Sequence, residues 1–183
     1  IVPLVLHPKE GLSLINGTQV STALAIKSMV DSEVLLQTAD IVGALSVEGS
    51  LSSRDVFKSS IHRLKKHQGQ KTAARNVWNM LAGSEIVSSH KECGTVQDPY
   101  SFRCIPHIHG SCRDSIKHCA DLINNEINSV SDNPIILDNG EIAYSGHFHA
   151  EPVAQAMDFI AIAMAELGAI SERRTYFFMK GVS

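Results

Sequence analysis

Residues 151–170 read EPVAQAMDFIAIAMAELGAI, and this stretch decides the fold. Its larger apolar side chains recur at helical spacing, which predicts one long helix that begins at His149 or Glu151 and ends near Phe178. The apolar line consists of Val153, Met157, Ile160, Met164 and Leu167. Alanine residues fill the other faces, and small side chains let neighbouring helices approach closely. We therefore expect this helix inside a multi-helix bundle rather than on its surface.

The polar side chains of the same stretch argue against a membrane-spanning segment. Gln155, Asp158 and Glu166 would lie in the hydrocarbon of a bilayer without partners, which costs free energy. We expect a buried helix of a soluble protein instead, with no membrane partner.

Two further helices are predicted on the N-terminal side of this stretch. Over 18–45, apolar side chains surround most of the helix circumference, so we expect a helix that is buried on several sides. Gly43 weakens this helix and Gly49 stops it, because glycine is less favourable than alanine in a helix by about 1 kcal/mol. Over 111–130, a second helix presents an apolar line that consists of Ile116, Cys119, Ile123 and Ile127.

A short β-hairpin is predicted between the last two helices. The sequence Ser131-Asp132-Asn133-Pro134 breaks the preceding helix, and two short apolar runs follow. Asn139-Gly140 lies between these runs and tolerates the positive φ angles of a tight turn. The predicted fold class is therefore mainly α, with long buried helices of a multi-helix bundle and one short β-hairpin.

Two segments are predicted to lie outside the bundle. The polar segment 50–92 is expected at the periphery, with an amphipathic helix over 70–81. The segment 94–106 contains glycine, proline and side chains able to bind a ligand, and it is predicted to be a loop. We treat 1–183 as one partial helical domain, because both ends of the sequence look cut: it begins without methionine and stops just after a helical run.

Composition narrows the class of partner and compartment. With 44% hydrophobic and 19% charged residues, the 183-residue chain has enough apolar material for one ordinary core. Its net charge of −3 and the short basic cluster 63–67 do not suit a nucleic acid partner. The four cysteines form no CxxC pair, which favours a reducing cytoplasm over a disulfide-rich secreted protein.

Six strings, in order along the chain, resemble the histidine and phenylalanine ammonia-lyases. They are KEGLSLINGTQ (9–19), HQGQ (67–70), QDPYSFRC (97–104), SVSDNP (129–134), FHAEP (148–152) and SERR (171–174). Pro99, Ser101 and Ser131, together with the SERR ending, resemble the histidine branch more than the phenylalanine branch. The resemblance covers essentially the whole chain and implies elimination of ammonia from L-histidine to give urocanate.

The resemblance also implies a set of site residues. Expelling ammonia requires an electrophile that activates the amine. In this family it is a methylidene-imidazolone made from Ala-Ser-Gly, a tripeptide that is absent from this sequence and lies upstream in the family. Tyr100 and Asn16 are the expected catalytic residues, and Arg103, Gln97 and Phe148 are the expected substrate-binding residues. A guanidinium suits a carboxylate because it forms a planar, two-bonded fork.

The family resemblance further implies a homotetramer whose pockets draw on several subunits, so the six strings are expected to converge in space between copies. The family commonly has Gln where this chain has His107 and Asn where it has His147, and we expect both rings near the pocket, where they could alter its pH dependence.

Other functions remain as alternatives. A phenylalanine or tyrosine ammonia-lyase or an aminomutase would share the same strings. A non-catalytic oligomerisation fragment would share the helices, and the isolated chain is expected to be inactive. Cys104, His107, His109 and Cys112 have residue types that bind zinc, but their spacing matches no common zinc finger, so no metal site is predicted.

Overall fold

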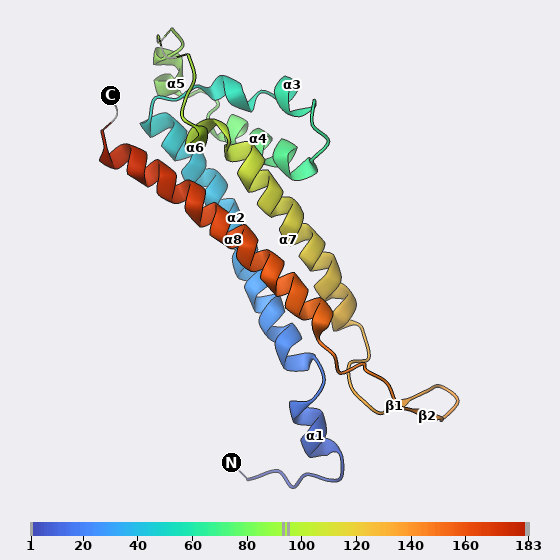
Figure 1. Cartoon of the computed structure of the whole chain (residues 1–183). Coiled ribbons are helices and arrows are strands. Elements are labelled where there is room, and N and C mark those ends of the chain that lie inside the picture. The colour runs from blue at the N-terminus through green and yellow to red at the C-terminus, as the bar shows by residue number, and fades with distance from the viewer. Residues whose placement is uncertain (1, 93, 95, 182–183) are drawn as a thin grey trace.

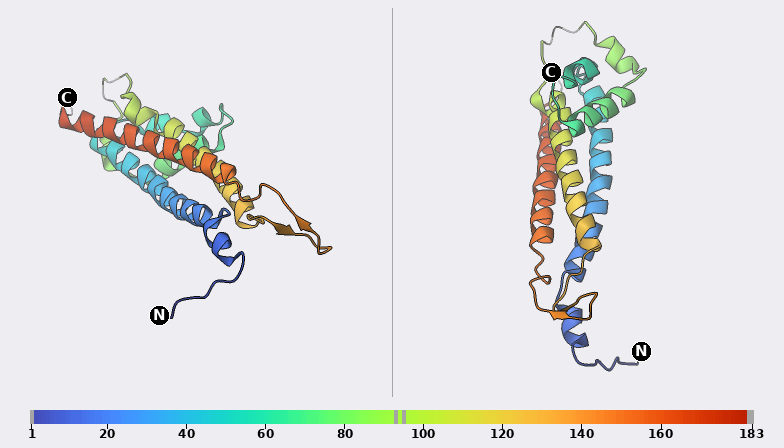
Figure 2. Two further views of the ribbon diagram at one scale, coloured as in Figure 1. Left: turned by 60° about the horizontal axis from the view of Figure 1, so that its bottom comes forward. Right: turned by 90° about the vertical axis from the view of Figure 1, so that its right-hand side faces the viewer.

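The computed structural model describes residues 2–92, 94 and 96–181. Three long helices run side by side within this part of the chain: α2 (Gln19–Gly49), α7 (Ile105–Ile127) and α8 (Glu151–Met179). They form an elongated bundle, with the small helices gathered at one end and α1 and the hairpin at the other (Figures 1 and 2). The predicted class, a mainly α bundle with one short hairpin, is confirmed.

The remaining elements are short. They are α1 (Glu10–Ile15), η1 (Arg54–Phe57), α3 (Ser59–His62), α4 (Gln68–Met80), α5 (Glu85–Ser89), α6 (Tyr100–Arg103), β1 (Ile135–Ile136) and β2 (Ile142–Ala143). β1 and β2 pair antiparallel, with Ile135 opposite Ala143. Gly140 has a φ of 83°, as the predicted turn requires.

The loop prediction over 94–106 is wrong in its second half. Tyr100–Arg103 forms α6, and α7 begins at Ile105, six residues before the predicted start. Pro106 lies in the first turn of α7, where its missing N–H costs nothing and its fixed φ suits the helix. The proline that suggested a loop therefore marks a helix start.

The expectation that the first long helix is buried on several sides is also wrong for this chain. The apolar side chains that predicted α2 are largely exposed: Val20, Leu24, Val30, Val34, Ile41 and Leu45. The buried face of α2 carries mostly small or polar residues, among them Ala25, Ser32 and Asp40. In this structure α7 and α8 cover only one side of α2. The apolar periodicity of the sequence does not predict which side of the helix that is. We call the six exposed residues the α2 apolar face.

The core follows the predicted apolar lines of α7 and α8, except that Ile127 at the end of α7 is exposed. Cys119, Ile123, Val153 and Ile160 are buried together toward the hairpin end. A second cluster fills the α6 end and consists of Ala44, Val47, Phe57, Val77, Leu81, Phe102, Ile105 and Ile170. By length and composition alone α8 could cross a membrane, but it packs along α7 and α2 with its apolar line inward, as a core helix does.

A buried carboxylate ties three helices together. Asp40 of α2 accepts hydrogen bonds from Nδ1 of His109 (2.9 Å) and the guanidinium of Arg113 (2.8 Å), both on α7. It also accepts one from the side-chain amide of Asn76 on α4 (2.7 Å). Asp40 is 2% exposed, so these three donors replace the water that a carboxylate would otherwise need.

Candidate active site

Tyr100 and Arg103 lie one turn apart on α6, at the end of the bundle where the small helices gather. The guanidinium carbon of Arg103 is 4.6 Å from the centroid of the Tyr100 ring, a cation–π arrangement. Tyr100 is 72% exposed and Arg103 is half-buried. Among the described residues no carboxylate pairs with Arg103, and its buried Nε has no hydrogen-bond partner. This arginine therefore presents a pre-oriented cation with unused donors.

A cavity of about 720 Å³ lies beside this pair, and its lining includes Gln97, Asp98 and Arg103. Its other walls come from η1, α5 and single residues of α3 and α4, together with the segments that connect these helices. Gln97 and Arg103, two of the expected substrate-binding residues, thus line the same cavity, whereas Tyr100 is not among its lining residues.

Sequence reasoning missed the anchor of this pocket segment. The carboxylate of Asp98 accepts a hydrogen bond from the backbone N–H of Ser53, at 2.8 Å, just before η1. This contact joins the chain between Gln97 and Tyr100 to a residue 45 positions earlier. Its only sequence signal was the acidic residue inside the QDPYSFRC string.

The other two predicted site residues lie at the opposite end of the bundle. Asn16 is the C-cap of α1, and Phe148 lies three positions before the start of α8 and is 42% exposed. Gly17, which follows Asn16, has a φ of 80°, and a Cβ atom there would lie 2.5 Å from the carbonyl oxygen of Ser131. The first and fourth family strings therefore pack tightly against each other.

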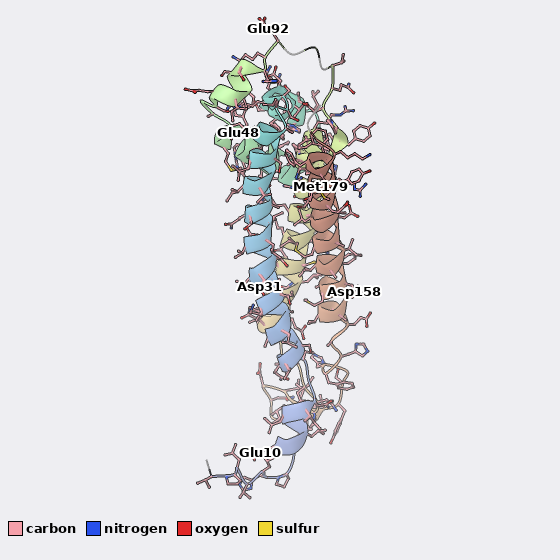
Figure 3. The ribbon with its side chains drawn as sticks, turned by 90° about the vertical axis from the view of Figure 1, so that its left-hand side faces the viewer. Glu10, Asp31, Glu48, Glu92, Asp158 and Met179 are labelled. Atoms are coloured by element: carbon pink, nitrogen blue, oxygen red, sulfur yellow. The ribbon has the colours of Figure 1, made fainter. Side chains whose placement is uncertain are left out.

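Within one chain the five predicted residues form two groups rather than one site. The 23 residues of α7 separate them, which is about 35 Å at roughly 1.5 Å per helical residue. Figure 3 shows the same separation, with Glu10 of α1 at one end and Glu48 and Met179 at the other. An amino acid is far too small to contact both groups of the same chain.

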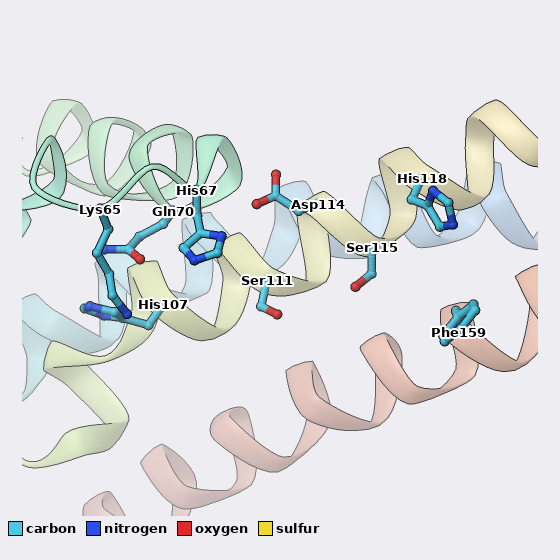
Figure 4. A pocket seen from close by; sticks show the side chains of 9 residues that line it. All are labelled: Lys65, His67, Gln70, His107, Ser111, Asp114, Ser115, His118 and Phe159. Carbon is cyan, nitrogen blue, oxygen red and sulfur yellow. The ribbon is translucent and has the colours of Figure 1, made fainter.

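His107 and His147, the two histidines that depart from the common family sequence, have different surroundings. His147 lies beside Phe148, and its Nδ1 is 2.8 Å from the hydroxyl oxygen of Ser145. His107 lines a separate cavity of about 500 Å³ with Lys65 and His67, on the α4 side of α7 (Figure 4), so it does not share the cavity of Gln97 and Arg103. Burial, followed by the charges of His62 and Lys65, lowers the pKa of His107.

The cysteines and histidines of α7 are engaged separately in packing. His109 is bonded to Asp40, and the thiol of Cys112 donates to the carbonyl oxygen of Ala163 at 3.2 Å. Burial raises the pKa of Cys112 to about 11, so its thiol stays protonated and is a poor metal ligand at neutral pH. No group of three or more ligating side chains is found among the described residues.

The fold and the site define a class of protein. It is a helical bundle with Arg103 and the exposed Tyr100 beside a cavity at one end, and with the expected site residues Asn16 and Phe148 at the other end. Within that class, the family model for aromatic amino acid lyases matches residues 1–182, so the chain belongs to the aromatic amino acid lyase family.

Individual relatives agree with this assignment. The chain is 51% identical to histidine ammonia-lyase of Burkholderia lata over 175 residues, which is 95% of this chain and 34% of that protein. Among solved structures, phenylalanine aminomutase of Pantoea agglomerans matches with a TM-score of 0.88 and 35% identity, over 98% of this chain and 38% of that one. Histidine ammonia-lyase of Trypanosoma cruzi matches with a TM-score of 0.82 and 34% identity, over 95% and 32%. The chain spans about a third of the length of the curated relatives it matches.

Proposed function

We propose that the complete polypeptide containing this chain eliminates ammonia from L-histidine to give urocanate, and that this chain supplies part of the substrate pocket. One observation carries the proposal: an Arg103 that pairs with no carboxylate of the described residues and stacks on Tyr100 beside a pocket, in a chain that is 51% identical to a histidine ammonia-lyase over 175 residues. The described helices would then be one part of a larger helical domain.

Arg103 is proposed to bind the α-carboxylate of the substrate. Its guanidinium is held by the Tyr100 ring and is not neutralised by any carboxylate of the described chain, so an incoming carboxylate gains a charge-assisted, two-bonded contact. Gln97, which lines the same cavity, would orient the substrate through its amide, and the Tyr100 hydroxyl would face the reacting end.

The residues at the other end suit the electrophile expected in this family. A methylidene-imidazolone, made from an Ala-Ser-Gly segment outside this sequence, would supply the electrophilic carbon that activates the substrate amine. The side-chain amide of half-buried Asn16 makes no hydrogen bond to the described residues, so it is free to donate to a ring carbonyl oxygen. Phe148 would cover the ring and exclude water.

Within one chain, the length of α7 separates the residues at the α6 end from Asn16 and Phe148. We therefore propose that the pocket forms between two copies of the chain. The α6 end of one chain would meet the hairpin end of another, in an antiparallel arrangement that suits the homotetramer expected for the family. The α2 apolar face supports this, because such a large exposed apolar surface usually packs against another chain or segment. Three described cysteines are free, which fits the expected cytoplasmic location.

The test is the reaction of the complete polypeptide with L-histidine. We expect urocanate, followed by its ultraviolet absorbance, and one ammonia for each urocanate. The isolated chain should release neither, because it lacks the Ala-Ser-Gly segment. Absence of urocanate from a complete polypeptide whose electrophile has formed would contradict the proposal, and urocanate from the isolated chain would contradict the assignment of the electrophile.

An aminomutase is the second candidate, because a phenylalanine aminomutase matches this fold as well as a histidine ammonia-lyase does. An aminomutase returns the amino group to the neighbouring carbon, so its product is a β-amino acid rather than an unsaturated acid. Mass analysis of the products from L-histidine and from L-phenylalanine separates the two functions.

A further inference from the structure

A single buried arginine of α8 lies beneath the pocket helix. Arg174 is 2% exposed, and among the described residues no carboxylate pairs with it. Its Nε is buried without a hydrogen-bond partner, and burial lowers the pKa of its guanidinium. A buried cation without a counter-charge costs folding free energy, so its presence calls for an explanation beyond stability.

The polar contact that Arg174 makes within the described part of the chain is with α6. Its guanidinium donates to the backbone carbonyl oxygen of Ser101, at 3.4 Å. α6 has four residues, and a helix that short leaves some of its carbonyl groups without intrahelical partners. Ser101 lies between Tyr100 and Arg103, so the donor reaches the backbone that carries both of these side chains.

Two aromatic side chains of α8 also pack against α6. Phe177 and Phe178 lie three and four positions after Arg174, which places all three side chains on one face of the helix. The ring centroid of the buried Phe102 is 5.0 Å from that of Phe177 and 6.1 Å from that of Phe178. α6 is therefore docked on α8 by an aromatic cluster and by one cation.

We propose that Arg174 is a positioning residue for the carboxylate site: it fixes the backbone of α6 so that Arg103 and Tyr100 keep the geometry that a substrate carboxylate requires. The inference rests on the proposed function. A small displacement of a substrate-binding group lowers the catalytic rate much more than it lowers the stability of the fold. A long hydrogen bond that holds Arg103 and Tyr100 in place can therefore be useful even though the buried charge of Arg174 costs folding free energy.

The experiment compares Arg174→Met with Arg173→Met in the complete polypeptide. The neighbouring Arg173 is the matched control, because it is exposed and paired with Glu172. The first readout, hydrogen exchange of the amides of 100–104, does not depend on activity. We expect about tenfold faster exchange in Arg174→Met and no change in Arg173→Met.

The second readout is competitive inhibition by two ligands. Imidazolepropionate carries a carboxylate and histamine does not. In Arg174→Met we expect the inhibition constant of imidazolepropionate and the KM for histidine to rise about 10- to 100-fold, while the constant for histamine changes less than about twofold. A merely structural residue would weaken both ligands alike. Arg174→Lys keeps the charge without the planar fork, so it should give a smaller effect of the same kind.

The outcomes separate the two proposals. A wild-type polypeptide that releases no urocanate contradicts the lyase function, and hydrogen exchange alone then decides the role of Arg174. The inference is overturned, while the lyase function stands, if the amides of 100–104 exchange at the wild-type rate in Arg174→Met. It is also overturned if the inhibition constants of imidazolepropionate and histamine rise by the same factor. If Arg174→Met does not fold, Arg174→Lys decides by the same readouts, and wild-type behaviour there overturns the inference.

Discussion

At the scale of single residues, the charge of Arg103 is the feature from which the proposed chemistry starts. In Arg103→Ala of the complete polypeptide, the loss of a charge-assisted carboxylate contact should cost about 2 to 4 kcal/mol in transition-state binding. The measurement is kcat/KM for histidine. Lys117→Ala is the control, since this exposed lysine of α7 makes only a surface ion pair with Asp121. Equal kcat/KM in Arg103→Ala and wild type would remove Arg103 from the site.

Cys112 gives a second prediction at this scale, which concerns stability against pH. Its pKa lies at about 11 in the folded chain, above the ordinary value of 9.0, so the unfolded chain loses this proton first. The stabilisation is fully present below pH 9 and is lost as the pH rises towards 11, by up to about 2 kcal/mol. Denaturant unfolding of wild type and Cys112→Ala between pH 8 and about 11 isolates the effect. Parallel curves for the two proteins would contradict it.

At the scale of elements, the packing of α4 against α7 depends on two glycines. A Cβ atom on Gly110 would lie 2.4 Å from the backbone nitrogen of Gln70, and one on Gly69 would meet the carbonyl oxygen of Gly110. Gly110→Ala should therefore force the helices apart and destabilise the fold by about 1 to 3 kcal/mol. Gly168→Ala in α8 is the matched control, because open space surrounds that position and alanine favours the helix by about 1 kcal/mol. Chemical denaturation measures both, and a stabilised Gly110→Ala would disprove the close contact.

At the scale of the whole molecule, the α2 apolar face and the two separated groups of site residues are the features on which the proposed assembly rests. Val34→Glu in the complete polypeptide places a charge in the middle of this face, where Val34 is 59% exposed in the single chain. We expect smaller particles by light scattering together with loss of urocanate formation, because a desolvated charge without a partner opposes association. Lys117→Glu, a charge change on α7, should alter neither. An active, full-sized Val34→Glu protein would mean that this face is not the interface.

Much of the fold was predictable from the sequence because the helix signals are local. The apolar lines of α7 and α8 and the Asn139-Gly140 turn need only neighbouring residues, and the observed elements match them. α6 escaped prediction because four residues carry too little periodicity. Arg103, Gln97 and Tyr100 could be singled out because they lie in one short string. Asp98 and Arg174 could not be assigned their contacts, since their partners lie 45 and 73 positions away.

By itself, the sequence determined the helical class, the family and the residue types of the proposed site, because periodicity and motif order are properties of the chain alone. Only the tertiary structure decided which face of α2 stays exposed and that Asn16 and Phe148 lie a full helix length from Arg103. The physical reason is that a helix with apolar side chains on every side can bury any of them. Packing against α7 and α8 selects one face, and it fixes how far apart the two ends of the bundle lie.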